Sequence, residues 1–208
     1  MKNTDYLLPA LAAVAVAILF PIYWIGQMPM GIGMEGADMV AGLFINISTL
    51  DLSDVLFLVL GLLTMYVYFK LIHLLNDQLN YSSLNIVIWI IIALNAIFTG
   101  TLVLDLYAST MSADTLASNE GYLVGSAMTI AAGSMILFGI LDIILGIALL
   151  RAAVPVPSVL KIFAVIAIIQ GVFEVSLFLS FMTLFIFPLA MIILAAAFMR
   201  NPDSIEVV

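Results

Sequence analysis

Long apolar stretches alternate with short polar segments along the whole chain, beginning with a run from Leu7 to Ile25. Runs of about 20 apolar residues are typical of helices that cross the hydrocarbon core of a bilayer. The pattern therefore predicts an all-α integral membrane protein, a single bundle of about six transmembrane helices over residues 1–208, joined by short loops. The expected spans are residues 6–27, 54–75, 84–107, 121–150, 158–177 and 183–200.

The last two spans are separated by an argument from length. From Val159 to Met199 the chain runs for 41 residues with almost no polar loop. A single helix of that length would extend about 60 Å, roughly twice the hydrocarbon thickness. We therefore expect a break near residues 177–183, where Ser180 and Thr183 supply local polarity. No Gly or Pro marks the place.

The composition agrees with a membrane location and argues against several classes of function. Hydrophobic residues make up 65% of the chain and charged residues 9%, and the mean hydropathy is +1.31. A soluble domain of this size cannot bury so much apolar surface. The net charge of −8 argues against binding to nucleic acid, which requires clustered Lys and Arg. The absence of cysteine excludes disulfides, thiolate metal sites and cysteine catalysis.

The basic residues predict the orientation. With six spans, every Lys and Arg falls on one side of the membrane: Lys2, Lys70, Arg151, Lys161 and Arg200. Short loops rich in Lys and Arg stay in the cytoplasm. Both termini are therefore expected to be cytoplasmic, in the cytoplasmic membrane of a bacterium or archaeon. The opposite side would carry acids and no base: Glu35, Asp38, Asp51, Asp54, Asp105, Asp114 and Glu120.

Polar residues within the spans are the candidates for a site, because an ionisable group at membrane depth costs free energy and usually faces protein or water. The candidate intramembrane polar residues are Lys70, Asn95, Asp142, Gln170 and Glu174. Asp142 and Lys70 have similar expected depths, so they would pair if the second and fourth spans touch. Gln170 and Glu174, four residues apart, share one face of the fifth span.

These residues have two interpretations. Asn95, Gln170 and the nearby Ser134 are typical of the interhelical hydrogen bonds that hold a bundle together. They would equally form a polar ladder for protons or cations, from Glu174 down to Asp142. Small residues in the fourth span also predict close helix packing: Gly125, Gly133, Gly139 and Gly146.

The sequence does not indicate an enzyme, and it predicts no metal or cofactor site. His73 is the only histidine, so it has no second imidazole or thiol with which to hold a metal. Asp142 and Glu174 would be the only paired acids, but their expected depths differ by well over 10 Å at about 1.5 Å per residue. We therefore expect a non-catalytic multi-pass subunit, surrounded by lipid, that forms a homo-oligomer or docks with other membrane subunits. The alternative is a small ion channel or proton-coupled transporter that uses the intramembrane acids.

Overall fold

The computed structural model describes residues 6–27, 44–45 and 47–200, and within these ranges the regular structure is helical, with no strand. Six segments are long and apolar enough to cross a membrane, which confirms the expected all-α arrangement and suggests a multi-pass membrane protein. They are α1 (Leu7–Gln27), α3 (Leu52–His73) continued by the π-helical η2 (Leu74–Gln78), α4 (Asn85–Thr99) with α5 (Leu102–Ser109), α7 (Glu120–Leu150), α8 (Ser158–Val175), and the 3-10 turn η3 (Ser180–Met182) with α9 (Thr183–Met199). A short helix, α6 (Ala113–Ser118), precedes α7.

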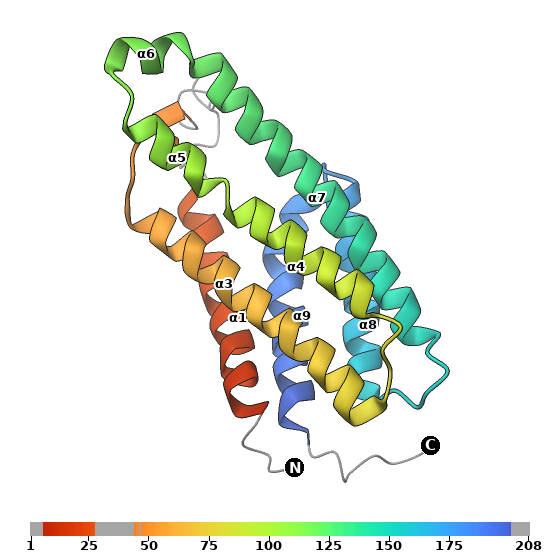
Figure 1. Cartoon of the computed structure of the whole chain (residues 1–208). Coiled ribbons are helices and arrows are strands. Elements are labelled where there is room, and N and C mark those ends of the chain that lie inside the picture. The colour runs from red at the N-terminus through yellow and green to blue at the C-terminus, as the bar shows by residue number, and fades with distance from the viewer. Residues whose placement is uncertain (1–5, 28–43, 46, 201–208) are drawn as a thin grey trace.

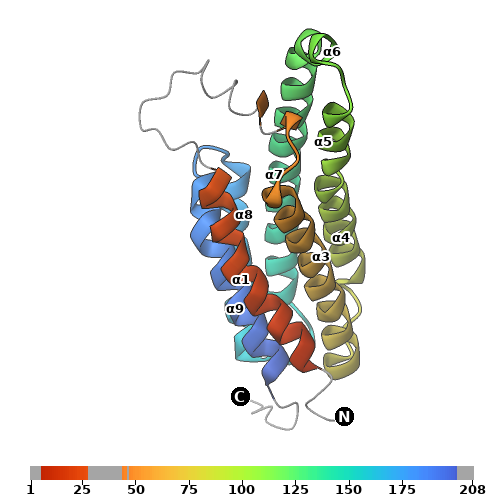
Figure 2. The ribbon, with the colours of Figure 1, turned by 90° about the vertical axis from the view of Figure 1, so that its left-hand side faces the viewer.

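The long helices pack in a closed ring that follows the order of the chain. Each long helix packs against the next one along the chain: α1 against α3, α3 against α4, α4 against α7, α7 against α8, and α8 against α9. The last helix, α9, packs against α1 and closes the ring. Figure 1 shows α3, α4 and α7 in front of α1, α8 and α9, and Figure 2 shows these two groups from the side. The ring closes where Tyr6 stacks on Phe198, with ring centroids 6.1 Å apart. The start of α1 and the end of α9 therefore meet at one end of the bundle.

The described bases lie at one end of the ring, together with Asp77, and most of the described acids lie at the other. The end at which Tyr6 meets Phe198, here called the basic end, carries the described bases Lys70, Arg151, Lys161 and Arg200. The opposite end, called the acidic end, carries acids that include Asp51, Asp54, Asp114 and Glu120. Lys2, Glu35 and Asp38 lie outside the described residues.

The half of the bundle next to the basic end is a solid apolar core. Most of the largest fully buried side chains lie there: Leu71, Leu75, Leu84, Ile88, Leu145, Leu149, Leu160, Phe163, Met191, Leu194 and Phe198. The outward helix faces are apolar as well, and they expose large side chains such as Leu62, Ile97 and Ile169. A surface of this kind is stable when lipid covers it.

The third expected span is interrupted, which the hydrophobic pattern did not predict. Between α4 and α5, the Thr101 N–H donates to the Phe98 carbonyl at 3.1 Å, and the Thr101 hydroxyl donates to the same carbonyl at 2.7 Å. A threonine hydroxyl that competes for a backbone carbonyl weakens the helical ladder. At the same level, Gly61 of α3 packs so closely on the Thr99 side chain that any Cβ at position 61 would overlap it.

The fifth and sixth spans are separated by a turn that needs neither Gly nor Pro. Leu177 adopts a left-handed conformation with φ of 50°. Ser176 holds the turn on both sides, because its hydroxyl donates to the Phe173 carbonyl at 2.8 Å and accepts from the Leu179 N–H at 3.1 Å. The chain thus breaks between Val175 and Ser180, and a leucine occupies the position where glycine is the usual residue.

Candidate functional site

Two buried acids share one amide group at the contact between α7 and α8. Asp142, Gln170 and Glu174 are each exposed by 5% or less. Gln170 Nε2 donates to Asp142 Oδ2 at 2.8 Å and to Glu174 Oε1 at 3.0 Å. Because both oxygens lie within 3.0 Å of one nitrogen, they cannot be farther apart than twice that distance. This group of three residues is called the acid cluster below.

Glycines bring the two helices of the acid cluster together. A Cβ added to Gly139 would lie 2.7 Å from the Gly171 carbonyl oxygen, and one added to Gly146 would overlap the Ala164 carbonyl. Small residues let helix backbones approach closely. Gly139 and Gly146 therefore allow the close helix packing that was expected of them, and the packing is between α7 and α8 of the same chain.

The predicted separation of Asp142 and Glu174 is wrong. α7 and α8 are antiparallel, and the contact of Gly139 with Gly171 sets their register. Glu174 lies one helical turn, about 5.4 Å, beyond Gln170. The long Glu174 side chain covers that turn, so its carboxyl group reaches the amide that also binds Asp142.

The expected pair of Lys70 and Asp142 is also wrong. Asp142 is hydrogen-bonded to Gln170, whereas Lys70 Nζ lies 5.8 Å from the centre of the Tyr66 ring. Within the described part of the chain, no ion pair joins Lys70 to Asp142. The physical reason is the orientation of α3, because Tyr68 lines the cavity together with Asp142, whereas Lys70, two residues farther along, lies on another face of the helix beside Tyr66.

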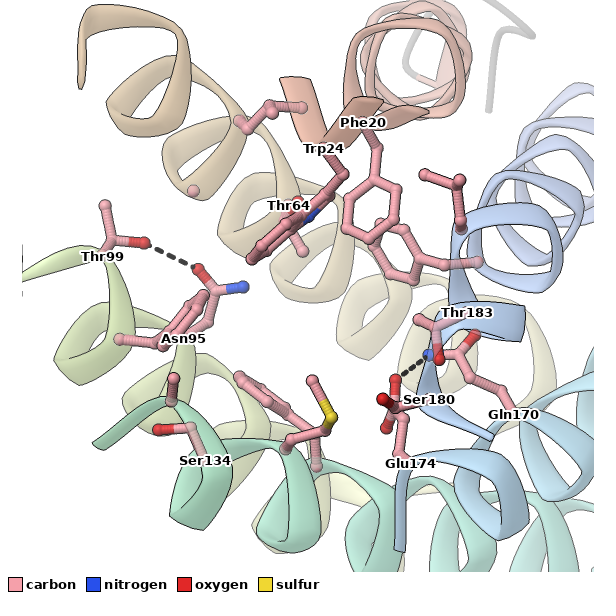
Figure 3. A pocket seen from close by; sticks show the side chains of 18 of the residues that line it. Phe20, Trp24, Thr64, Asn95, Thr99, Ser134, Gln170, Glu174, Ser180 and Thr183 are labelled. Carbon is pink, nitrogen blue, oxygen red and sulfur yellow. Dashed lines mark hydrogen bonds between the residues drawn. The ribbon is translucent and has the colours of Figure 1, made fainter. Parts of the chain in front are cut away.

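A cavity of about 570 Å³ lies inside the ring, and the acid cluster forms part of its wall. Its size falls within the range of about 300–1,000 Å³ that is typical of small-molecule sites. Its polar lining comes from several helices, as Figure 3 shows for most of these side chains: Thr64, Tyr68, Asn95, Thr99, Ser134, Asp142, Gln170, Glu174, Ser180 and Thr183. None of the described residues that line the cavity is Lys, Arg or His.

Four of the five candidate polar residues, Asn95, Asp142, Gln170 and Glu174, therefore line one cavity, and Lys70 does not. Asn95 is outside the acid cluster, and its Oδ1 accepts a hydrogen bond from the Thr99 hydroxyl at 3.3 Å. The candidate polar residues therefore form a compact acid cluster, with the amide group of Asn95 on another part of the cavity wall, and they do not form a continuous ladder.

Sequence reasoning missed two groups of lining residues. Thr64 and Tyr68 are buried on the face of α3 that begins at Gly61. Their spacing places all three on one side of a helix, which was the available signal. The aromatic residues are harder to find, because Phe and Tyr occur throughout the chain: Phe20, Tyr23, Trp24, Phe57, Phe98, Phe138, Phe181 and Phe187 also line the cavity.

The chemistry of the acid cluster follows from its charge. Two carboxylates buried without a basic partner repel each other, so a proton or a cation must offset their charge. Glu174 Oε2 and Thr183 Oγ1 are buried and have no hydrogen-bond partner. Among the described residues, no group of three or more His, Cys, Asp or Glu side chains could hold a metal ion. The arrangement is suited to binding positive charge, either a proton or a cation.

Comparison of the chain with protein-family models, curated proteins and solved structures found no match. The geometry and charge of the cavity are therefore the basis for assigning a function.

Proposed function

We propose that this chain is a proton-coupled transporter of the cytoplasmic membrane, with both termini in the cytoplasm, and that Asp142 and Glu174 are its proton-binding groups. The observation that carries the proposal is the sharing of the Gln170 amide by two buried carboxyl groups, on a cavity wall with no described base. Intramembrane acids of this kind are typical of proton relays.

The packing of the bundle favours a transporter over an open channel. A channel needs a continuous polar path, but the half of the ring next to the basic end is filled by side chains such as Leu71, Leu145 and Leu194. A transporter instead exposes its site to one side at a time. The cavity and its acids fit a state that is closed toward the basic end.

The interruption between α4 and α5 supports the same conclusion. Discontinuous helices beside a central site are characteristic of secondary transporters. Asn95 and Thr99, in the last turns of α4, line the cavity directly before the interruption at Gly100. A change in the angle between α4 and α5 would therefore alter the cavity wall.

Proton flux into liposomes tests the proposal. Purified protein is reconstituted with a pH-sensitive dye inside, and a pH gradient or a potential is imposed. Each measurement is made without and with a membrane-impermeant organic cation outside, because a coupled transporter moves protons only when its second substrate is present. We expect a proton flux with the wild type, and we expect Glu174→Gln and Asp142→Asn to abolish it. The reason is that a side-chain amide, unlike a carboxyl group, does not bind and release a proton near neutral pH. Glu120→Gln makes the same change at the acidic end, outside the cavity, and should retain the flux. Equal flux in all variants, or none in the wild type, would exclude the proposal.

A second candidate, the self-associating membrane subunit, is favoured by a separate feature of α7. Gly121 and Gly125 are exposed, four residues apart, and a Cβ on either would meet nothing within 4 Å. This spacing is typical of helices that dimerise in membranes. The chain has no cysteine, so Gly125→Cys should give disulfide-linked dimers in membranes. Ile169→Cys, on the exposed face of α8, serves as the control.

A further inference from the structure

Seven aromatic rings form a continuous series of contacts around the cavity. In order they are Phe187, Phe20, Trp24, Tyr23, Phe57, Phe98 and Phe138, and neighbouring centroids lie between 4.5 and 6.3 Å apart. We call this series the aromatic belt. Its residues come from α9, α1, α3, α4 and α7, and all of them line the cavity.

The aromatic belt and the acid cluster occupy complementary parts of one wall. The belt crosses five helices of the ring, and α8, the helix without a belt residue, supplies Gln170 and Glu174. Phe138 and Asp142 lie one turn apart on α7, so the last ring of the belt borders the acids. A molecule in the cavity would meet aromatic faces and carboxyl groups together. Figure 3 shows Phe20 and Trp24 across the same space from Glu174.

These features define the charge and size of a ligand. Aromatic faces attract cations, and the carboxyl groups do the same, whereas an anion would find no described base on the wall. A proton or bare metal ion would make no use of a cavity of about 570 Å³ bordered by seven rings. The matching ligand is an organic molecule with an apolar body and one positive charge.

We propose that the cavity binds monovalent apolar organic cations, held by the aromatic belt and the acid cluster; this inference rests on the transport role proposed above and names its substrate class. Each cation that binds displaces one proton from the acid cluster, so that the charge of the site is conserved. The other titratable side chains on the cavity wall are Tyr23 and Tyr68, while α4 and α9 contribute the neutral Asn95 and Thr183. The cycle is thus an exchange of an organic cation for a proton.

Binding of tetraphenylphosphonium to the purified protein tests this inference, with tetraphenylborate as an anion of the same shape. Calorimetry should detect binding of the cation and not of the anion. In weakly buffered solution, about one proton should be released per cation bound, because cation and proton compete for the coupled acids. Glu174→Gln should weaken binding by about tenfold or more, since it removes a charge in a medium of low dielectric constant.

Variants of the belt test its part separately. Trp24→Leu should weaken binding about threefold to thirtyfold, because a cation–π contact is lost, and Trp24→Phe should restore part of the affinity. Trp89→Leu is the matched control, because Trp89 is half exposed and contacts Phe69 away from the cavity. Phe57→Leu provides a second belt variant if Trp24→Leu fails to fold.

The outcomes separate this inference from the proposed transport role. Glu174-dependent proton flux without binding of tetraphenylphosphonium would overturn the organic-cation site and leave proton transport in place. Equal binding of tetraphenylborate, or cation binding that neither Glu174→Gln nor the belt variants weaken, would overturn it as well. Cation binding with the expected variant effects, but without any proton flux when the organic cation is present on one side of the membrane, would uphold the site and remove the transport role.

Discussion

Gly139 of α7 and Gly171 of α8 pack directly against each other's backbone. A Cβ on Gly139 would lie 2.7 Å from the Gly171 carbonyl oxygen, and a Cβ on Gly171 would approach the Gly139 carbonyl even more closely. This contact fixes the register in which Asp142 meets Gln170. The acid cluster therefore depends on two residues that have no side chain.

Substitution of Gly139 by alanine should separate the two helices. We expect Gly139→Ala to lower the free energy of unfolding by about 1–3 kcal/mol, as overpacking does in other cores. Gly133→Ala is the control, because a Cβ there meets nothing within 4 Å. It should be neutral or stabilising by up to about 1 kcal/mol, since alanine favours a helix. Thermal unfolding in detergent, followed by circular dichroism, measures both, and equal destabilisation would contradict the close contact.

Removal of the shared amide should cost more than removal of the amide across the cavity. Gln170→Leu leaves acceptors on both Asp142 and Glu174 without their donor, at about 1–3 kcal/mol for each buried acceptor. Asn95→Leu breaks one hydrogen bond, to Thr99, at a half-buried position, and should cost about 1 kcal/mol. Denaturation of the two variants in the same detergent gives the comparison. An Asn95 variant less stable than the Gln170 variant would refute this ranking.

The cap of α3 should make stability depend on pH. Hydrogen bonds from the Ser53 hydroxyl and N–H lower the pKa of Asp51 below its usual value, and Asp54 accepts from the Asp51 N–H at 2.8 Å. Because the folded-state pKa is lower than the unfolded one, this stabilisation is present above the unfolded pKa. It is lost as the pH falls through the folded-state value.

Two variants at position 51 test this dependence. Asp51→Ala should lower stability near pH 7 by about 1 kcal/mol, the usual cost of a lost helix cap. Its deficit relative to the wild type should shrink in acid. Asp51→Asn keeps an acceptor without a titrating group, so it should be less sensitive to pH than the wild type. Melting temperatures across a pH series measure this, and parallel curves for all three proteins would argue against the cap.

The turn between α8 and the last span contains a conformational strain that substitution should relieve. Leu177 has φ of 50°, a left-handed conformation that costs about 1–2 kcal/mol for a residue with a Cβ. Leu177→Asn should therefore leave stability unchanged or raise it, because Asn tolerates this region. Val165→Asn makes a comparable change on the exposed face of α8 and should be destabilising. Melting temperatures measured in one detergent show whether each substitution stabilises or destabilises the protein. A clear loss of stability in Leu177→Asn would contradict the left-handed conformation of Leu177.

The proposed orientation can be checked with reporter fusions. Reporters placed after Ser82, Thr115 and Pro202 should give cytoplasmic, external and cytoplasmic signals respectively, because Lys and Arg loops stay inside. The outcome depends on the turn at Leu177, which returns the chain to the basic end. An external signal after Pro202 would contradict it.

The sequence predicted the helices and several site residues, because apolar length and polar side chains are properties of single segments. Asp142, Gln170 and Glu174 stand out in apolar runs whatever their neighbours are. Their convergence could not be predicted, since it depends on the register between helices, which Gly139 and Gly171 set.

The errors have the same origin. The pairing of Lys70 with Asp142 rests on similar expected depths and on contact between the second and fourth spans, but it also depends on which face of α3 turns toward the cavity. That face carries Tyr68, and Lys70 lies beside Tyr66. At the interruption after Thr99, the Thr101 hydroxyl donates to the Phe98 backbone carbonyl. A pattern of apolar and polar positions contains no information about such a bond. The aromatic belt joins residues from five helices, so no single segment contains its pattern.

The position of Trp24 gives the protein an internal optical reporter. The chain has two tryptophans, one on the cavity wall within the aromatic belt and the other, Trp89, on an outward face beside Phe69. In a Trp89→Phe variant, the remaining indole emission would come from the cavity alone. Its wavelength and quenching would then follow the polarity and contents of the cavity in real time, without any added dye.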